Sequence, residues 1–257
     1  MSAGKGSFAY AGGATLLDPA SSSTAGGAAP KTHPWPPIDP TKNQIITIIG
    51  KKGSGKSVAA RHLFRSWPGS DRLIIDITGD ADPGDDMNAI RLPQDLTRLP
   101  AFDPNQGPQV YRWIPDTRSA TFRDDIDRAL GAGLYPKDRP VLVWVDEKGE
   151  AFKANQTGPH GRTALHQGRH HKLSMILCGP RAMGVEPLCI SQGDRVLMYD
   201  VPNPADRERI AANIGVSPRV LTAELNETKR RGPYWYLMYV AAEDQLYRCP
   251  PLPHQES

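Results

Sequence analysis

One stretch of the chain combines residue types and spacing that suit the binding of a phosphate chain. Residues 50–57 read Gly-Lys-Lys-Gly-Ser-Gly-Lys-Ser and match the pattern G-x-x-x-x-G-K-[ST] in full. Glycines in such a loop let backbone N–H groups turn inward around phosphate oxygens, and the lysine adds a mobile positive charge. The stretch therefore predicts a P-loop that binds ATP.

The expected nucleotide ligands are the residues of this loop and the one that follows it. Lys56 is expected to reach the β and γ phosphates, and the hydroxyl of Ser57 to hold Mg²⁺. The full set of expected cofactor-binding residues is Gly50, Lys51, Lys52, Gly53, Ser54, Gly55, Lys56, Ser57 and Val58. The predicted cofactors are ATP and Mg²⁺.

A pair of acids provides the second chemical feature. Residues 140–145 read Pro-Val-Leu-Val-Trp-Val, an apolar run typical of a parallel strand buried on both faces, and Asp146 and Glu147 follow it. Ligands of open α/β sheets bind beyond the carboxyl ends of the strands, so Asp146 is expected to contact Mg²⁺ directly or through water. Glu147 is expected to polarise the attacking water as general base. The alternative is that both acids merely end a strand.

The acid pair also bears on the class of reaction. A kinase of small molecules shares the P-loop, but its nucleophile is the substrate, and it needs a lid and an acceptor pocket. A glutamate directly after the aspartate suits attack by water, as in motor ATPases. The sequence therefore favours ATP hydrolysis over phosphotransfer.

The elements around these residues have the character that the chemistry requires. A β-branched run at 44–49 precedes the loop and predicts a strand, and residues 58–65 predict a helix whose N-terminus faces the phosphates. Further strands are expected at 72–77, 109–114, 173–178 and 195–199, and a further helix at 120–134. The acidic stretch 79–86 fits either a cation site or a solvated turn, and its spacing favours the turn.

Composition limits the domain organisation. Residues 1–40 are rich in Gly, Ala, Ser and Pro and predict a flexible arm, residues 41–250 a P-loop ATPase domain, and residues 251–257 a tail. Three cysteines without metal-ligand spacing suggest a reducing compartment. No apolar run approaches the length of a membrane span, so a soluble protein, inside a cell or packaged in a particle, is expected.

The charge balance constrains any nucleic-acid partner. The net charge is only +3, from 31 basic and 28 acidic residues, so no global basic field indicates DNA binding. A DNA partner would need a local patch or a ring of subunits. The candidate patches are a basic turn at 229–231 and a cluster of Arg61, His62 and Arg65 on the P-loop helix.

The order of motifs resembles the HerA/FtsK superfamily of P-loop ATPases that pump DNA. The resemblance covers residues 43–215, from the two motifs above through Gly168-Arg169-His170 to the strand ending at Tyr199, and extends to a C-terminal hairpin at 234–240 and 245–249. It is strongest to the compact members that package genomes into tailless icosahedral viruses with an internal membrane. One departure concerns a polar γ-phosphate sensor in the family's Thr-Gln-Arg-Pro segment, where this chain has Gly179-Pro180-Arg181-Ala182.

The resemblance implies a fold, an activity and partners. The implied fold is a RecA-like α/β domain with a mostly parallel sheet flanked by helices and a C-terminal β-hairpin. The implied assembly is a homo-oligomer, a hexameric ring, that moves double-stranded DNA without sequence specificity at a virion vertex or in the host cytoplasm, with a capsid-vertex or membrane protein as further partner. An arginine from the next subunit would stabilise the transferring phosphoryl group; the candidates are Arg162, Arg169 and Arg181, with Arg169 first.

Three other functions remain open from the sequence. One is a nucleotide-dependent switch or assembly factor that binds a capsid or membrane protein without pumping DNA. The second is a cellular or plasmid-borne DNA translocase, and the third is a small-molecule kinase. Stimulation of ATP hydrolysis by DNA separates the motors from the switch and the kinase.

Overall fold

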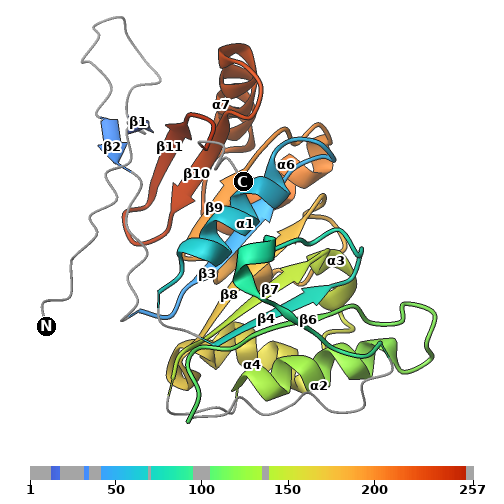
Figure 1. Ribbon diagram of the computed structural model, residues 1–257. Coiled ribbons are helices and arrows are strands. Elements are labelled where there is room, and N and C mark those ends of the chain that lie inside the picture. Colours follow the sequence, from blue (N-terminus) through green and yellow to red (C-terminus); the bar gives the residue numbers. More distant parts are fainter. Residues whose placement is uncertain are drawn as a thin grey trace, which may run out of the picture.

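The computed structural model describes residues 13–17, 32–34, 42–68, 71–94, 105–134 and 139–252. Within these residues, eleven strands form a single sheet in the order β2-β1-β11-β10-β9-β3-β8-β7-β4-β6-β5 (Figure 1). The strands are β1 (Gly13–Leu17), β2 (Thr32–Pro34), β3 (Ile45–Ile49), β4 (Asp71–Asp76), β5 (Ile90–Arg91), β6 (Val110–Trp113), β7 (Val141–Asp146), β8 (Leu173–Gly179), β9 (Arg195–Met198), β10 (Tyr236–Val240) and β11 (Gln245–Cys249).

The sheet is parallel from β9 to β5 and antiparallel beyond β9. β3 pairs with β8 and β9, β7 with β8 and β4, and β6 with β4 and β5, all in parallel. The C-terminal hairpin of β10 and β11 continues the sheet because β10 pairs antiparallel with β9. The predicted α/β fold with a mostly parallel sheet and a C-terminal hairpin is confirmed.

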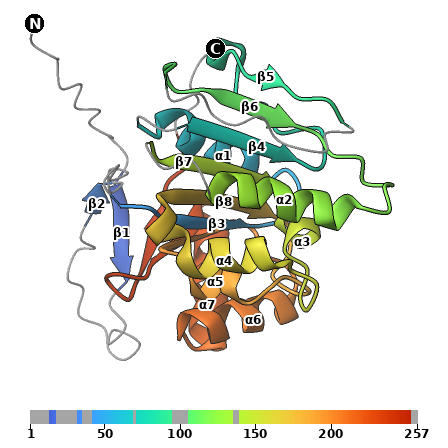
Figure 2. The same ribbon diagram turned by 90° about the horizontal axis from the view of Figure 1, so that it is seen from below.

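Helices cover both faces of the sheet, as the two views together show (Figures 1 and 2). One face carries α1, and the opposite face carries α2 and α4 beside α5, α6 and α7. The helical segments are α1 (Lys56–Ser66), α2 (Phe122–Leu134), α3 (Lys148–Ala151), α4 (Pro159–Gln167), α5 (Leu188–Ser191), α6 (Pro204–Ile214) and α7 (Pro218–Arg231), with 3₁₀ turns η1 (Asp85–Met87) and η2 (Gly168–His171). In the described part of the chain, no helix has the length and apolar character of a membrane span.

The central strands are apolar because both of their faces are covered. Every residue of β3, β7 and β8 is buried. Successive side chains along β3 enter different clusters, so that Ile46 packs with the α1 face and Ile45 with the α2 face. Full burial of one such side chain contributes about 1.5–3 kcal/mol, so these three strands form the stable centre of the molecule.

The parallel strands bring distant parts of the chain together at one edge of the sheet, the edge formed by the carboxyl ends of the strands. The P-loop follows β3, Glu147 follows β7, Pro180 follows β8 and Tyr199 follows β9. Because β3, β8, β7 and β9 all run the same way, their carboxyl ends lie together. The P-loop and the acid pair therefore lie at the same edge of the sheet.

The predicted N-terminal arm contains two described segments. β1 pairs antiparallel with β11, and β2 pairs with β1, so the arm adds two strands to the hairpin side of the sheet. The other residues of the arm lie outside the described residues, as do residues 253–257 of the tail, and the flexible arm over residues 1–40 stays a prediction.

Candidate active site

The P-loop connects β3 to α1 by a tight turn that only glycine permits at two points. A Cβ at Gly50 would lie 2.6 Å from the Cβ of Tyr199. Gly55 has φ +101°, and a Cβ there would lie 3.2–3.3 Å from the rings of Tyr234 and Tyr199. The loop therefore passes closely over the end of β9 and leads directly into the N-terminus of α1.

Polar groups of the loop are arranged as an anion site requires. The Nζ of Lys56 donates a hydrogen bond to the carbonyl oxygen of Lys51 at 2.9 Å, which holds the ammonium group over the loop. The hydroxyl of Ser54 is buried and has no hydrogen-bond partner among the described residues. An unpaired buried hydroxyl is costly, so its presence here fits a loop built to receive phosphate oxygens.

Lys51 is tied to the end of β9. Its backbone N–H donates to the carbonyl oxygen of Asp200 at 2.8 Å, and its Nζ lies 2.6 Å from Oδ2 of Asp200. Lys229, in the last turn of α7, lies 3.7 Å from the same carboxylate oxygen. Asp200 therefore links the P-loop to α7, a contact that the sequence pattern does not reveal because the three segments are far apart in the chain.

Asp146 ends β7 and is nearly buried. Its Oδ2 accepts a hydrogen bond from the hydroxyl of Thr78 at 2.6 Å. Burial raises the pKa of Asp146 above its ordinary value.

The sequence does not reveal Thr78 as a partner of Asp146, and the only available signal was its position two residues after β4. The carboxylate of Asp146 and the hydroxyl of Ser57, on the first turn of α1, are oxygen ligands of the kind that Mg²⁺ prefers.

Glu147 adopts a backbone conformation that is unusual for a residue with a side chain. Its φ is +63° and its ψ is +60°, in the left-handed region. Such a conformation costs on the order of 1 kcal/mol or more and persists only where the surroundings impose it. Burial raises the pKa of the Glu147 carboxyl, which makes the carboxylate a better proton acceptor. The structure thus places both predicted acids at the edge of the sheet that carries the P-loop.

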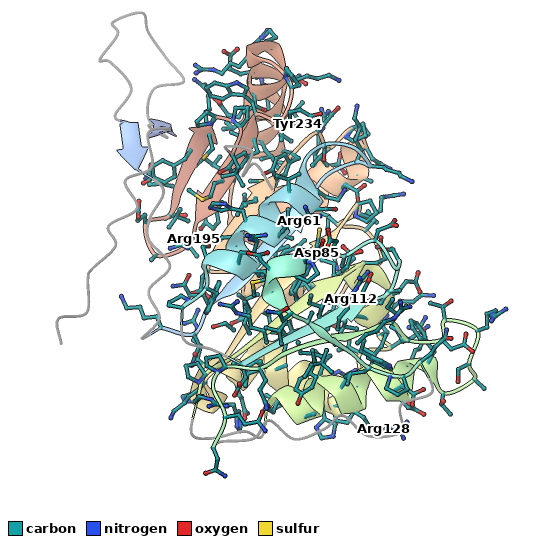
Figure 3. All side chains as sticks on the ribbon, in the orientation of Figure 1. Arg61, Asp85, Arg112, Arg128, Arg195 and Tyr234 are labelled. Atoms are coloured by element: carbon teal, nitrogen blue, oxygen red, sulfur yellow. The ribbon has the colours of Figure 1, made fainter. Side chains whose placement is uncertain are left out.

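The acidic stretch 79–86 is a folded turn. Asp82 forms an ion pair with Arg61, and Asp86 forms one with Arg65, both on α1. Figure 3 labels Arg61, on α1, and Asp85, in the 3₁₀ turn η1 of this stretch. Two of the three basic residues proposed to contact DNA from α1 therefore have carboxylate partners within the chain.

A buried ion pair fixes the start of that turn. Asp76, fully buried at the end of β4, accepts hydrogen bonds from the backbone N–H groups of Gly79 and Ala81. Its other oxygen binds Arg112 of β6 at 2.6 Å. Asp76 is therefore a structural residue that holds the loop carrying Thr78 against the end of the sheet.

The candidate arginines lie at different places. Arg181 follows β8 at the P-loop edge, where its Nε lies 2.7 Å from the buried carboxylate of Asp206. Arg169 lies in η2, before β8, and binds Asp194 at 2.6 Å. Arg169 therefore lies at the amino ends of the parallel strands, whereas the P-loop lies at their carboxyl ends. The two are separated by the length of β3, five residues or about 16 Å. Arg162 is exposed on α4.

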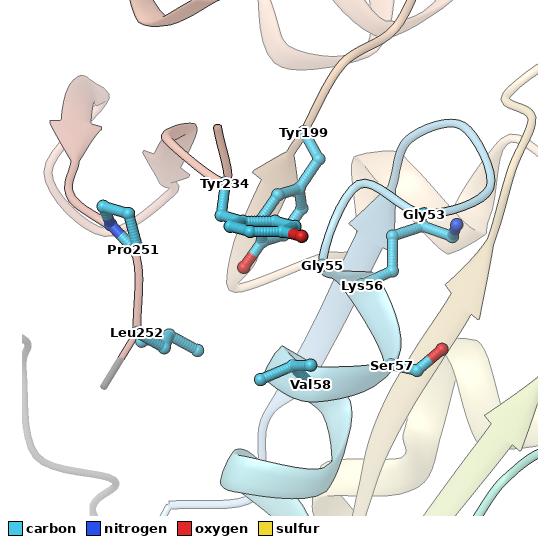
Figure 4. Close-up of a pocket in the computed structure, with 9 residues that line it drawn as sticks. All are labelled: Gly53, Gly55, Lys56, Ser57, Val58, Tyr199, Tyr234, Pro251 and Leu252. Carbon is cyan, nitrogen blue, oxygen red and sulfur yellow. The ribbon is translucent and has the colours of Figure 1, made fainter. Parts of the chain in front are cut away.

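A pocket of about 290 Å³ lies between the P-loop, the loop that joins α7 to β10 and the segment after β11 (Figure 4). Its walls are Gly53, Gly55, Lys56, Ser57, Val58, Tyr199, Tyr234, Pro251 and Leu252. The ring of Tyr199 is itself held by stacking on Tyr236, at 4.8 Å between ring centroids. The pocket therefore offers aromatic and aliphatic surface directly beside the predicted phosphate site, and it includes two residues assigned to the tail from the sequence.

Together the fold and the site give the chain the α/β fold and the phosphate-binding loop of P-loop NTPases. No protein-family model matches it. Among curated proteins it is similar to the DNA packaging ATPase P9 of Enterobacteria phage PRD1, with 24% identity over 228 residues that cover 83% of this chain and 89% of the relative.

Solved structures extend the comparison. The genome packaging NTPase B204 of Sulfolobus turreted icosahedral virus 2, in complex with AMPPCP, matches with a TM-score of 0.63 and 21% identity, covering 84% of this chain and 100% of that chain. The pCW3 conjugation coupling protein TcpA matches with a TM-score of 0.54 and 14% identity, over 82% of this chain and 61% of that chain. At these identities the structures establish the fold. The predicted resemblance to genome-packaging ATPases is confirmed by the similarity to P9 and B204.

Proposed function

We propose that this chain is an ATP-hydrolysing DNA translocase that pumps double-stranded DNA into a viral capsid. The observation that carries the proposal is the placement of Asp146 and Glu147 at the same sheet edge as a complete P-loop. The similarity to P9, a DNA packaging ATPase, and to B204, a genome packaging NTPase, supports packaging as the use of that hydrolysis.

Each residue of the site has a proposed role in hydrolysis. The backbone of residues 50–57 binds the phosphates, and Lys56 stabilises charge on the β and γ phosphates. Glu147 accepts a proton from the attacking water. Ser57 and Asp146 would hold Mg²⁺, which supplies positive charge to the phosphate oxygens when bound.

The pocket beside the P-loop is the proposed nucleobase subsite. A base stacked on Tyr234 would lie against Val58 on one side and Leu252 on the other, while its phosphates reach the loop. Stacking of a base on an aromatic side chain is worth about 1–3 kcal/mol. The subsite therefore contributes affinity through the shape and face of the base.

The variant Tyr234→Ala tests this subsite. We expect the Kd for ATP, measured by titration with a fluorescent analogue, to rise about tenfold, because the stacking surface is lost. Tyr234→Phe keeps the aromatic face and should retain the wild-type affinity. Binding of inorganic triphosphate, which has no base, should be unchanged, and an equal loss for both ligands would place Tyr234 outside the base subsite.

The proposed assembly is a ring in which ATP lies between subunits and DNA passes through the centre. Arg169 is the first candidate for the arginine that reaches the neighbouring subunit's nucleotide, because it lies far from its own P-loop and its side chain is 63% exposed. Arg181 is the second candidate. The proposed location is the vertex of the virion, or the host cytoplasm before assembly, with a capsid-vertex or membrane protein as partner.

Steady-state ATP hydrolysis with and without long double-stranded DNA tests the proposed function. We expect DNA to stimulate hydrolysis several-fold at low salt and less at higher salt, because a motor that slides contacts phosphates, and such contacts weaken with salt. Hydrolysis that ignores DNA would contradict the motor. In that case Pro180, at the position of the family's polar sensor, would favour a slow nucleotide-dependent switch.

A further inference from the structure

Lys148, the residue directly after the two acids, is a lysine without contact with solvent. It opens α3, and its relative exposure is 0%. Lysine is almost never fully buried unless its amine has partners, because removing the charged group from water is costly. Burial accordingly lowers the pKa of Lys148. The roles proposed above for the site do not use this side chain, so its burial calls for another explanation.

The amine of Lys148 joins the ends of three neighbouring strands. Its Nζ lies 3.4 Å from the carbonyl oxygen of Ile48 and 3.3 Å from that of Gly179. Ile48 belongs to β3, two residues before the P-loop, and Gly179 ends β8 beside Arg181. Lys148 itself follows β7. One side chain therefore connects the strand of the P-loop, the strand of the acid pair and the strand between them.

Glu147 and Lys148 converge on the same small space above Gly179. A Cβ at Gly179 would lie 3.1 Å from Nζ of Lys148 and 3.4 Å from Oε1 of Glu147. The thiols of Cys178 and Cys189 also lie near the amine, and burial raises the pKa of both, so they remain neutral. The absence of a side chain at Gly179 therefore allows Glu147 and Lys148 to pack together.

We propose that Lys148 is a positioning residue that holds Glu147 in its left-handed conformation and so keeps the carboxylate directed at the nucleotide edge. The inference rests on the proposed role of Glu147 as general base. A strained residue needs neighbours that fix it. Because the amine of Lys148 is anchored on β3 and β8, it fixes the backbone of the preceding residue, Glu147. Since a displacement of about 1 Å at a reacting group can cost about 100-fold in rate, the anchor acts on turnover.

The variant Lys148→Met tests the inference, because methionine fills similar space without N–H donors. We expect kcat for ATP hydrolysis to fall about 10- to 100-fold while the Kd for ATP stays within about twofold of wild type. The thermal unfolding midpoint should change little, because the loss of two long hydrogen bonds to carbonyl oxygens is offset by removal of a buried amine that is costly to desolvate. Lys153→Met, the same change at an exposed lysine nearby, should alter none of these values.

A second variant reaches the same geometry from the other side. Gly179→Ala keeps the side chains of Glu147 and Lys148, but the added methyl group crowds and displaces them. We therefore expect kcat to fall about tenfold with ATP affinity retained. Wild-type turnover in Lys148→Met would overturn the inference. A variant Lys148→Met that fails to fold, or that loses ATP affinity along with turnover, would also overturn it by showing a general structural role.

The variant Glu147→Gln, measured alongside, separates this inference from the proposed function. Wild-type turnover in Glu147→Gln would remove the general base and the proposed mechanism with it. An inactive Glu147→Gln beside a fully active Lys148→Met would overturn only the positioning role, and the proposed function would stand.

Discussion

Lys56 and Glu147 reach one edge of the sheet from different strands, and the roles proposed for them belong to different steps of ATP hydrolysis. The proposed contacts of Lys56 with phosphate would be made in both the bound state and the transition state. Glu147 has no ionic partner within 4.0 Å among the described residues, and its raised pKa suits proton transfer from water. Binding and bond cleavage should therefore be separable by single substitutions.

The first prediction concerns binding. Lys56→Ala should raise the Kd for ATP about 100-fold, which abolishes binding at micromolar nucleotide, because a charge-assisted contact to phosphate is lost. Equilibrium titration with a fluorescent ATP analogue measures this change, with Lys153→Ala as control. Tight ATP binding by Lys56→Ala would refute the assignment of the loop.

The second prediction concerns turnover. Glu147→Gln should bind ATP within about twofold of wild type but hydrolyse it at least about 100-fold more slowly, because the amide cannot accept the proton of the water. Release of inorganic phosphate under single-turnover conditions reports the step directly. Unchanged release would remove Glu147 from the mechanism.

The sequence reveals some of the residues at the site and conceals others. The P-loop and the acid pair are recognisable because each is contiguous and has a fixed chemical pattern. Thr78, Asp200 and Lys148 act through contacts with distant parts of the chain. The partners Asp146, Lys51 and Gly179 lie 68, 149 and 31 positions away, respectively. Such contacts depend on the order of strands in the sheet, and no local spacing records that order.

At the scale of elements, hydrophobic pattern predicted the central strands and the helices α1 and α2 to within about two residues of their ends. The pattern works there because β3, β7 and β8 are buried on both faces and α2 on one. It does not predict the helix at residues 229–231, which are expected to form a basic turn and are instead the last turn of α7. Their charges suit the C-terminus of a helix, where they interact with its dipole.

Asp206 connects α6 to the segment that follows β8 at the site. Its carboxylate, on the first turn of α6, accepts hydrogen bonds from the backbone N–H groups of Ala182 and Met183 and from Arg181. The segment after β8 is therefore held by one buried side chain.

The third prediction follows from this contact. Asp206→Ala should lower the free energy of unfolding by about 2–4 kcal/mol, because one buried N–H group, one partly buried N–H group and one guanidinium lose their acceptor. Urea unfolding followed by circular dichroism measures the change. Glu208→Ala, at an exposed position of the same helix, should change stability by less than about 0.5 kcal/mol. Equal effects of the two substitutions would show that Asp206 is not the anchor.

At the scale of the whole molecule, Arg169 and Arg181 lie at opposite ends of the strands. Arg181 is at the edge formed by their carboxyl ends, and Arg169 is at the edge formed by their amino ends. A subunit that used Arg181 would place it near its own nucleotide, whereas Arg169 suits the nucleotide of a neighbour. The strand order that creates this difference comes from tertiary pairing and was not predicted in detail, although the parallel arrangement was.

Mixed rings provide the fourth prediction. Arg169→Ala subunits and Glu147→Gln subunits should each be inactive alone, and mixing them should restore part of the ATP hydrolysis, because some interfaces then combine an intact arginine with an intact base. Hydrolysis measured across a series of mixing ratios gives the result. The matched series with Arg181→Ala is the comparison, and absence of recovery with Arg169→Ala would assign that arginine to its ion pair with Asp194.

The two borders of the sheet have a consequence for how copies of the chain can meet. Among the described residues, one border is β2, of three residues, and the other is β5, of two, while β11, of five residues, is covered by β1. Short outer strands present few unpaired backbone groups and give little template for strand addition or for aggregation through sheet edges. In the proposed ring, contacts between subunits would then be made by side-chain surfaces of helices and loops, which can slide and rearrange during a catalytic cycle more readily than a continuous backbone ladder.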